Sequence, residues 1–167
     1  MKTVTLCRHA KSSWKHPQMT DFERPLNKRG QRDAPVMAAR LAQRSFSPDI
    51  IVSSPATRAR TTALTVAEGI GFPVEAVLYD QQVYTSSAAA LLALINSRDD
   101  SFSSLLLVGH NPACTNLANA LGGLHLDNIP TCGVVSLQFA VPKWEDIGCG
   151  TGSLLFFDYP KNQHATA

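Results

Sequence analysis

Two histidines and two arginines of this 167-residue sequence follow segments that are expected to end a strand or to begin a helix. Guanidinium groups present forked N–H donors that fit phosphate oxygens, and an uncharged imidazole is a nucleophile toward phosphorus. Brought together, such residues would bind a phosphoryl group and transfer it to nitrogen. The four residues are Arg8, His9, Arg58 and His110.

His9 is the candidate nucleophile of this set. Positive charge from neighbouring arginines disfavours the protonated imidazole and so keeps the ring neutral. Attack on phosphorus would form a phosphohistidine, with Arg8, Arg58 and His110 holding the equatorial oxygens, and water would then release phosphate. We predict a phosphatase that needs no metal and no other cofactor, since the sequence contains no acidic cage for a divalent ion.

Alternating strand and helix patterns predict how these residues are positioned. Expected strands cover residues 4–7, 49–52, 74–78, 105–108, 134–141 and 152–157. Expected helices cover residues 28–44, a stretch from Pro55 to about Gly69 with Ser54 as its cap, a segment capped by Ser86 or Ser87, and residues 112–121. The alternation predicts a three-layer α/β/α sandwich with a largely parallel sheet. The carboxyl ends of such strands border one crevice, where we expect the four residues to converge.

Four ordered segments resemble the boxes of the histidine phosphatase superfamily. Leu6-Cys7-Arg8-His9-Ala10 resembles its Arg-His-Gly signature, with Ala10 in place of glycine. The other three are Asp21-Phe22-Glu23-Arg24-Pro25-Leu26-Asn27-Lys28-Arg29-Gly30, Ser53-Ser54-Pro55-Ala56-Thr57-Arg58-Ala59-Arg60-Thr61-Thr62-Ala63 and Val108-Gly109-His110-Asn111-Pro112. Over about residues 3–120 the chain is most similar to the SixA-like branch, the phosphohistidine phosphatases.

This resemblance implies a phosphoglycerate mutase-like fold and a role for each residue of the set. His9 would be the nucleophile, and His110 would be the second histidine of the site. Arg8 and Arg58 would clamp the phosphate. The roles agree with those that the residue types suggest by themselves.

The proton donor is where this chain departs from the family pattern. Other members place a glutamate after the third strand or an aspartate after the second histidine, whereas here Asn111 follows that histidine. Asp80, in the third-strand region, and Asp21, in the first loop, are the candidate donors. An imidazole leaves more easily than an alkoxide, because its conjugate acid has a pKa of about 6.5, so a phosphohistidine substrate needs less acid help.

Three further residues near the signature have structural alternatives. Lys11 either donates to phosphate or is solvated, so we include it as a candidate phosphate-binding residue. Arg24 is expected to pair with Asp21 and thereby fix the first loop. Cys7 lies in an expected strand, where a buried cysteine behaves as a small hydrophobic residue.

The first functional hypothesis is the hydrolysis of phosphohistidine in a protein, such as a histidine phosphotransfer domain. One alternative is a phosphomonoesterase that acts on a small sugar or aryl phosphate. A second alternative is a binding module that holds phosphate without turnover. The partner is thus a phosphorylated protein or a small phosphorylated substrate.

Charge is unevenly distributed: residues 1–60 carry twelve Lys/Arg and four Asp/Glu, and residues 61–167 carry three and nine, so +8 is followed by −6. Without a Lys/Arg-rich run, this basic third suits a local anionic ligand and not a nucleic acid. The sequence contains no apolar run long enough for a membrane span, and its four cysteines form no CxxC pair, so we expect a cytoplasmic protein. We expect one domain over residues 1–167; the sequence does not set the oligomeric state, and a monomer is compatible with it.

Overall fold

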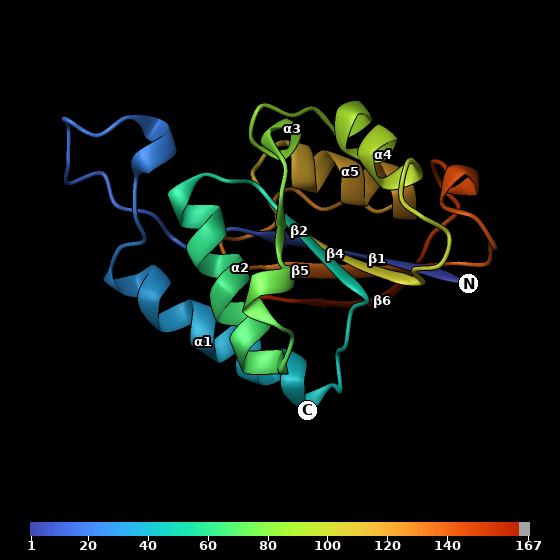
Figure 1. Ribbon diagram of the computed structural model, residues 1–167, viewed down its shortest axis with the longest axis horizontal. Coiled ribbons are helices and arrows are strands. Elements are labelled where there is room, and N and C mark those ends of the chain that lie inside the picture. Colours follow the sequence, from blue (N-terminus) through green and yellow to red (C-terminus); the bar gives the residue numbers. More distant parts are fainter. Residues whose placement is uncertain (164–167) are drawn as a thin grey trace.

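A six-stranded sheet forms the centre of the computed structural model, which describes residues 1–163 (Figure 1). Its strands lie in the order β3-β2-β4-β1-β5-β6. They are β1 (Lys2–Arg8), β2 (Ile50–Ser53), β3 (Leu78–Tyr79), β4 (Ser104–Gly109), β5 (Val134–Phe139) and β6 (Ser153–Asp158). Pairings among β1 to β4 are parallel, and β5 is antiparallel to both of its neighbours. The prediction of a largely parallel sheet is confirmed.

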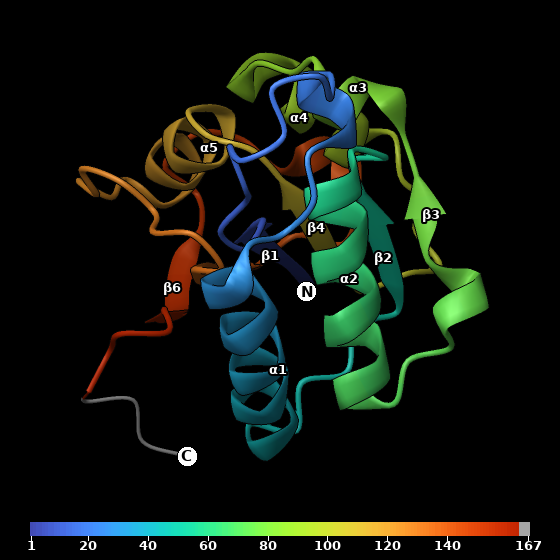
Figure 2. The ribbon, with the colours of Figure 1, turned by 90° about the vertical axis from the view of Figure 1, so that its left-hand side faces the viewer.

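Helices cover both faces of this sheet (Figure 2). One face carries α1 (Lys28–Gln43) and α2 (Thr57–Ile70), and the other carries α3 (Gln81–Tyr84), α4 (Ala88–Asn96) and α5 (Ala113–Gly122). Three short 3-10 helices lie in the connections: η1 (Asp21–Glu23), η2 (Val74–Ala76) and η3 (Trp144–Asp146). Within residues 1–163, no helix is long and apolar enough to cross a membrane.

The central strand β4 shows why its sequence is apolar throughout. Leu105 and Leu107 pack with α4 and α5, whereas Leu106 and Val108 pack with α1 and α2. All four side chains are fully buried. A strand with helices on both faces has no solvent side, so its residues do not alternate between apolar and polar.

Two expectations, one about the third strand and one about the start of the helix after the second strand, are wrong. The segment predicted as a strand over 74–78 is mostly η2, and only Leu78 and Tyr79 pair with β2. β3 lies at the edge of the sheet, where only β2 supplies backbone hydrogen-bond partners to this segment of the described chain. The second error concerns Ser54, because α2 begins two residues later than a Ser54 cap would place it, with Ala56 as the N-cap. The Ser54 hydroxyl instead contacts the Ala56 N–H and His110.

The loop after β1 folds back on itself before α1 begins. Ser12 forms a bridge with Leu26, and the Asn27 N–H donates to the Lys11 carbonyl at 3.0 Å. Residues 14–24 therefore project from the body as a closed loop, seen in blue in Figure 1. The Gly30 backbone lies against the Lys11 carbonyl oxygen so closely that a Cβ there would collide with it. This contact fixes the loop on the first turn of α1.

We expect Gly30→Ala to lower the free energy of unfolding by about 1–3 kcal/mol, because the added methyl group forces the loop off α1. Urea denaturation measures the loss. Gly148→Ala is the matched control, since a Cβ at Gly148 meets no atom within 4 Å. Equal stability of the two variants would show that the loop does not depend on this close approach.

Candidate active site

The parallel register of three neighbouring strands brings the predicted residues together. β4 lies between β1 and β2, and Arg8 pairs with Gly109 while Ser53 pairs with Val108. The three strands therefore end at the same level of the sheet. Beyond these ends the His9 N–H donates to the Gly109 carbonyl at 3.0 Å, which extends the alignment into the site.

His9 is 8% exposed and presents one ring nitrogen as a lone pair. Its Nδ1 lies 2.7 Å from the carbonyl oxygen of Ala10, and because a carbonyl can only accept, Nδ1 carries the proton. Nε2 therefore has the lone pair, which accepts a hydrogen bond from Arg58 Nε at 3.3 Å. A neutral ring in this tautomer is able to attack phosphorus through Nε2.

The surroundings of His9 lower its pKa to about 3. Burial is the largest cause, because it penalises the charged ring. The hydrogen bond to Ala10 opposes the shift, and the positive charges of Arg58 and Arg8 add to it, as does His110. Positive neighbours thus contribute to the neutral state as expected, but burial contributes more.

Arg58 stands in the first turn of α2 and is 5% exposed. Besides its contact with His9, its Nη1 donates to the Asp21 carbonyl at 2.6 Å and its Nη2 to the Asp21 carboxylate at 3.0 Å. Thr62 fastens α2 to the end of β1, because its Oγ1 donates to the Arg58 carbonyl and accepts the Ala10 N–H. These contacts use three of the five N–H groups of Arg58 and leave two for a ligand.

His110 follows β4, is half-buried, and its ring centroid lies 5.1 Å from that of His9. Burial, followed by the charge of Arg58, lowers its pKa to about 4. Its Nε2 lies 2.8 Å from Ser54 Oγ, which already accepts the Ala56 N–H and so can donate its own proton to Nε2. Nδ1 then carries a proton, is buried and has no partner in the described chain, so it is suited to a phosphoryl oxygen.

Arg8 ends β1 and is half-buried. Its Nη1 donates to the Ile129 carbonyl at 2.9 Å, and Asn111 Nδ2 donates to the same carbonyl at 3.1 Å. Asn111, which stands where some relatives have an aspartate, therefore holds the segment that orients Arg8. Arg8 Nε is buried without a partner among residues 1–163, and a buried donor of this kind normally has one.

Asp21 reaches the site from the projecting loop and bridges two arginines. Its Oδ2 accepts hydrogen bonds from Arg58 Nη2 at 3.0 Å and from the Tyr84 hydroxyl at 2.8 Å. Its Oδ1 accepts from Arg24 Nε at 3.2 Å and Nη2 at 3.0 Å, which confirms the expected pairing of Arg24 with Asp21. Arg24 is buried, with its guanidinium 3.6 Å from the centre of the Trp14 ring.

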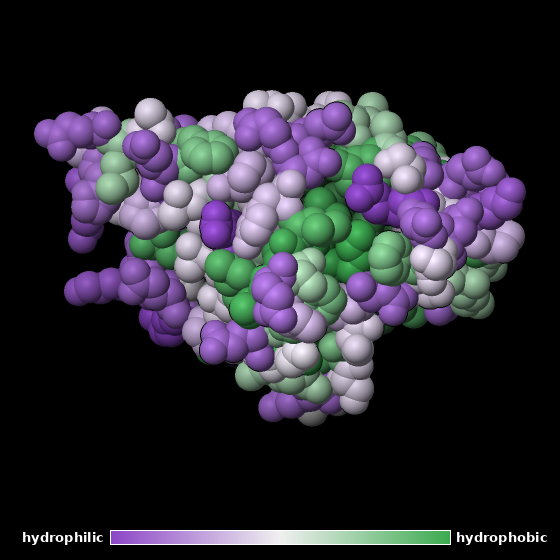
Figure 3. All heavy atoms as spheres, viewed as in Figure 1, coloured by the Kyte–Doolittle hydropathy of each residue, from purple (hydrophilic) through white to green (hydrophobic). Residues whose placement is uncertain are grey.

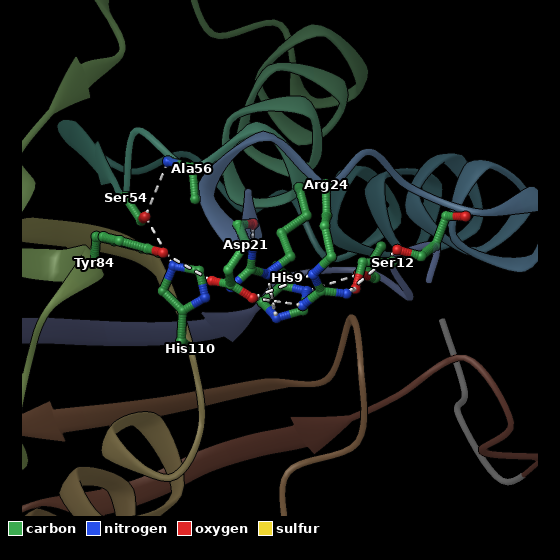
Figure 4. A network of polar contacts seen from close by, with 11 residues as sticks. His9, Ser12, Asp21, Arg24, Ser54, Ala56, Tyr84 and His110 are labelled. Carbon is green, nitrogen blue, oxygen red and sulfur yellow. Dashed lines mark hydrogen bonds and ion pairs between the residues drawn. The ribbon is translucent and has the colours of Figure 1, made fainter. Parts of the chain in front are cut away.

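Five side chains thus close a circuit of contacts, which we call the contact ring. His9, Asp21, Tyr84 and His110 of this circuit are labelled in Figure 4. Burial by itself raises the pKa of Asp21, but the hydrogen bonds from Tyr84, Arg58 and Arg24 together outweigh it and lower that pKa to about 2. The carboxylate in the contact ring is therefore ionised at neutral pH. In order, the ring consists of His9, Arg58, Asp21, Tyr84 and His110.

The remaining predicted residues contact the chain differently. The Asp80 carboxylate accepts the Gln82 N–H at 2.8 Å and so caps α3. Lys11 is held through its backbone by Asn27 and Gly30. Neither contact connects these side chains to the contact ring, and their predicted roles as proton donor and phosphate ligand stay untested.

Tyr84 is the member of the contact ring that the sequence analysis did not select. Its helix α3 has four residues, too few for a periodic pattern, and its hydroxyl meets Asp21 across 63 positions of the chain. No local signal in the sequence marks it. Ser54 and Thr62 fall inside the second arginine box, but their hydrogen bonds with His110 and Ala10 also depend on tertiary structure.

At about pH 5.5, where an ordinary imidazole is mostly protonated, we expect the rings of His9 and His110 to remain neutral. Their pKa values of about 3 and about 4 lie below that pH because burial disfavours the cation. Ring ¹⁵N chemical shifts measured during acid titration test this, with His9→Gln and His110→Gln to assign the signals. Protonation of His9 near the ordinary value would contradict the buried, neutral nucleophile.

Comparison of the sequence with known proteins supports the resemblance of the four boxes. The model of the histidine phosphatase superfamily (branch 1) matches residues 4–78. An uncharacterized chloroplastic protein of Arabidopsis thaliana is 32% identical over 153 residues, which cover 87% of this chain and 70% of that protein. An uncharacterized protein of Mycobacterium tuberculosis is 30% identical over 92% of this chain and 99% of its own length.

Solved structures of related proteins have the same fold as this chain. A structure from Agrobacterium tumefaciens, assigned to the phosphohistidine phosphatase SixA, superposes with a TM-score of 0.81 at 30% identity and covers 95% of this chain and 98% of that one. A protein histidine phosphatase SixA in complex with tungstate superposes with a TM-score of 0.76 at 22% identity, covering 95% and 97%. The first match supports a phosphatase activity, and the second shows the shared fold. The chain belongs to the histidine phosphatase superfamily, in its SixA-like branch.

Proposed function

We propose that this phosphatase hydrolyses phosphohistidine in proteins through a covalent phosphohistidine at His9. The observation that supports it most is the Nδ1–H tautomer of a buried, neutral His9, whose Nε2 lone pair faces Arg58. Two structurally similar proteins, both assigned to the phosphohistidine phosphatase SixA and one in complex with tungstate, support the same chemistry. The four free thiols of the chain suit the reducing cytoplasm in which we place it.

The reaction proceeds in two steps at His9. In the first, the Nε2 lone pair forms a bond to phosphorus while the bond to the leaving nitrogen breaks and its electron pair departs with that nitrogen. Arg58 Nε moves from Nε2 to a phosphoryl oxygen, and Arg8 and His110 bind the other oxygens. In the second, water attacks phosphorus, phosphate leaves, and Nε2 regains its lone pair.

A phosphohistidine substrate fits the acid–base properties of the site. The carboxylate of the contact ring belongs to Asp21, and with a pKa of about 2 it has no proton to give at neutral pH. An ester needs a proton for its departing alkoxide, whereas an imidazole departs as a neutral base. The proposed reaction also needs no metal, because Arg8, Arg58 and His110 bind the phosphoryl oxygens that a metal ion would otherwise hold.

We expect the protein to release phosphate from a phosphorylated histidine phosphotransfer domain in excess chelator. His9→Ala should abolish turnover and retain phosphate binding, because the covalent route is lost while the clamps remain. Acid-labile, base-stable label on His9 after rapid quenching identifies the intermediate. Turnover of a sugar or aryl phosphate without release of phosphate from the phosphotransfer domain would favour the phosphomonoesterase. If neither label nor turnover is seen with any substrate, the binding module is favoured. Loss of activity with chelator would contradict metal independence.

Arg58→Ala should weaken phosphate binding by about 1.5–3 kcal/mol and reduce kcat further, because charge on the phosphoryl oxygens grows in the transition state. Calorimetry and steady-state kinetics measure the two effects. Arg60→Ala is the matched control, since Arg60 lies in the same helix but is exposed and stacks on Tyr79. Equal losses in the two variants would indicate a general effect of helix charge and not a clamp.

A further inference from the structure

The contact ring has a side that lies away from the nucleophile. His9 contacts Arg58 and His110, so Asp21 and Tyr84 are the two members of the contact ring that it does not contact. In-line displacement places the leaving group opposite the attacking atom. For a phosphoryl group bound at His9 Nε2, the members of the contact ring that remain available to a leaving group are Asp21 and Tyr84.

This side of the contact ring is also open to solvent. The Asp21 side chain is 50% exposed, whereas His9 is 8% exposed. The projecting loop that carries Asp21 lies at the left of Figure 3, where hydrophilic side chains dominate the surface. A leaving group that belongs to another protein can remain outside while its phosphoryl group reaches His9.

An aromatic wall continues from the nucleophile to this open side. The rings of His110 and Tyr84 meet edge to face with centroids 5.5 Å apart, and those of Tyr84 and Phe22 do the same at 5.1 Å. Aromatic rings attract flat groups, and they attract cations through their faces. The wall therefore suits a flat ring that carries positive charge.

Charge and hydrogen bonding on the same side favour that kind of group. The Tyr84 hydroxyl donates its proton to Asp21 Oδ2, so its oxygen lone pairs remain to accept an N–H from a ligand. The Asp21 carboxylate then lies directly behind this acceptor. It also offsets the charges of Arg24 and Arg58, which would otherwise repel a cation.

Building on the phosphohistidine phosphatase function above, we propose that Asp21, Tyr84 and Phe22 form a leaving-group subsite that takes a protonated imidazole ring. The ring donates its N–H to Tyr84 and packs on the aromatic wall. When the P–N bond breaks, its electron pair stays on the departing nitrogen, and the ring leaves as neutral imidazole with its other N–H in place. No proton donor is needed, and Asp21 acts by keeping the ring protonated until the bond breaks.

The test compares N-phosphoimidazole with phenyl phosphate, whose leaving group is also flat but carries no N–H and no positive charge. In Asp21→Asn we expect the ratio of kcat/KM values, phosphoimidazole over phenyl phosphate, to fall by at least about tenfold. Tyr84→Phe keeps the aromatic wall and should lower the ratio by a smaller factor. Glu23→Gln is the matched control, since it removes a charge two residues away that contacts Thr20 and no arginine, and its ratio should not change.

The pH profile gives a second readout that also works on the unchanged protein. A carboxylate beside the bound imidazole favours its protonated form. The kcat on phosphoimidazole, which reports the bound state, should therefore persist above the pH at which the free substrate loses its proton. In Asp21→Asn this alkaline limit should move to lower pH. Phenyl phosphate, which has no such proton, should show no corresponding shift.

Different outcomes separate the subsite from the function on which it rests. Wild-type protein that hydrolyses phenyl phosphate but not phosphoimidazole would overturn both. Turnover of phosphoimidazole with unchanged ratios in Asp21→Asn and Tyr84→Phe would overturn the subsite alone, and equal losses on both substrates would assign Asp21 to holding Arg58. Calorimetric binding of inorganic phosphate shows whether the phosphate site of each variant is intact. If Asp21→Asn no longer binds phosphate, the kcat/KM ratio of Tyr84→Phe and the pH profile of the wild-type protein decide whether the subsite exists.

Discussion

The hydrogen bond from His9 Nδ1 to the Ala10 carbonyl is the interaction on which the chemistry of this site depends. It joins neighbouring residues, yet it determines which ring nitrogen carries the proton and which one can attack. Burial then keeps the ring neutral by penalising its charged form. In the proposed mechanism, a buried imidazole with its lone pair toward a guanidinium group is preorganised to accept a phosphoryl group.

The rest of the fold holds this ring and its partners in register. β1, β4 and β2 end at one level because they pair in parallel, and Thr62 ties the first turn of α2 to the residue after His9. The helices on both faces remove the strands from water, so this alignment is part of the core. The alignment of the side chains at the strand ends is thus a consequence of packing within the core.

A carboxylate inside the proposed phosphate site is the feature that needs explanation. Asp21 pairs with Arg24 and Arg58, so it limits the positive charge there and, in the proposed mechanism, would compete with phosphate for Arg58. A role only in orienting Arg58 would account for its hydrogen bonds. Its position beside Tyr84, on the open side away from His9, also allows it to act on the group that leaves.

Local patterns in the sequence were sufficient for most of the helices and strands and for the candidate residues that follow them. The apolar run of β4, a serine cap at position 86 or 87, which the structure places at Ser87, and the boxes around His9, Arg58 and His110 are all signals between near neighbours. The predictions for the edge strand β3 and for the start of α2 were wrong, because the strand that pairs with β3 and the His110 ring that contacts the Ser54 hydroxyl lie elsewhere in the chain. The tautomer of His9, the ionised state of Asp21 and the place of Tyr84 were decided only by the tertiary structure. The state of Asp21 and the place of Tyr84 depend on contacts between distant segments, which leave no trace in the spacing of residues along the chain. The tautomer of His9 depends on how its ring is oriented toward the adjacent Ala10 carbonyl, and residue types alone do not specify that orientation.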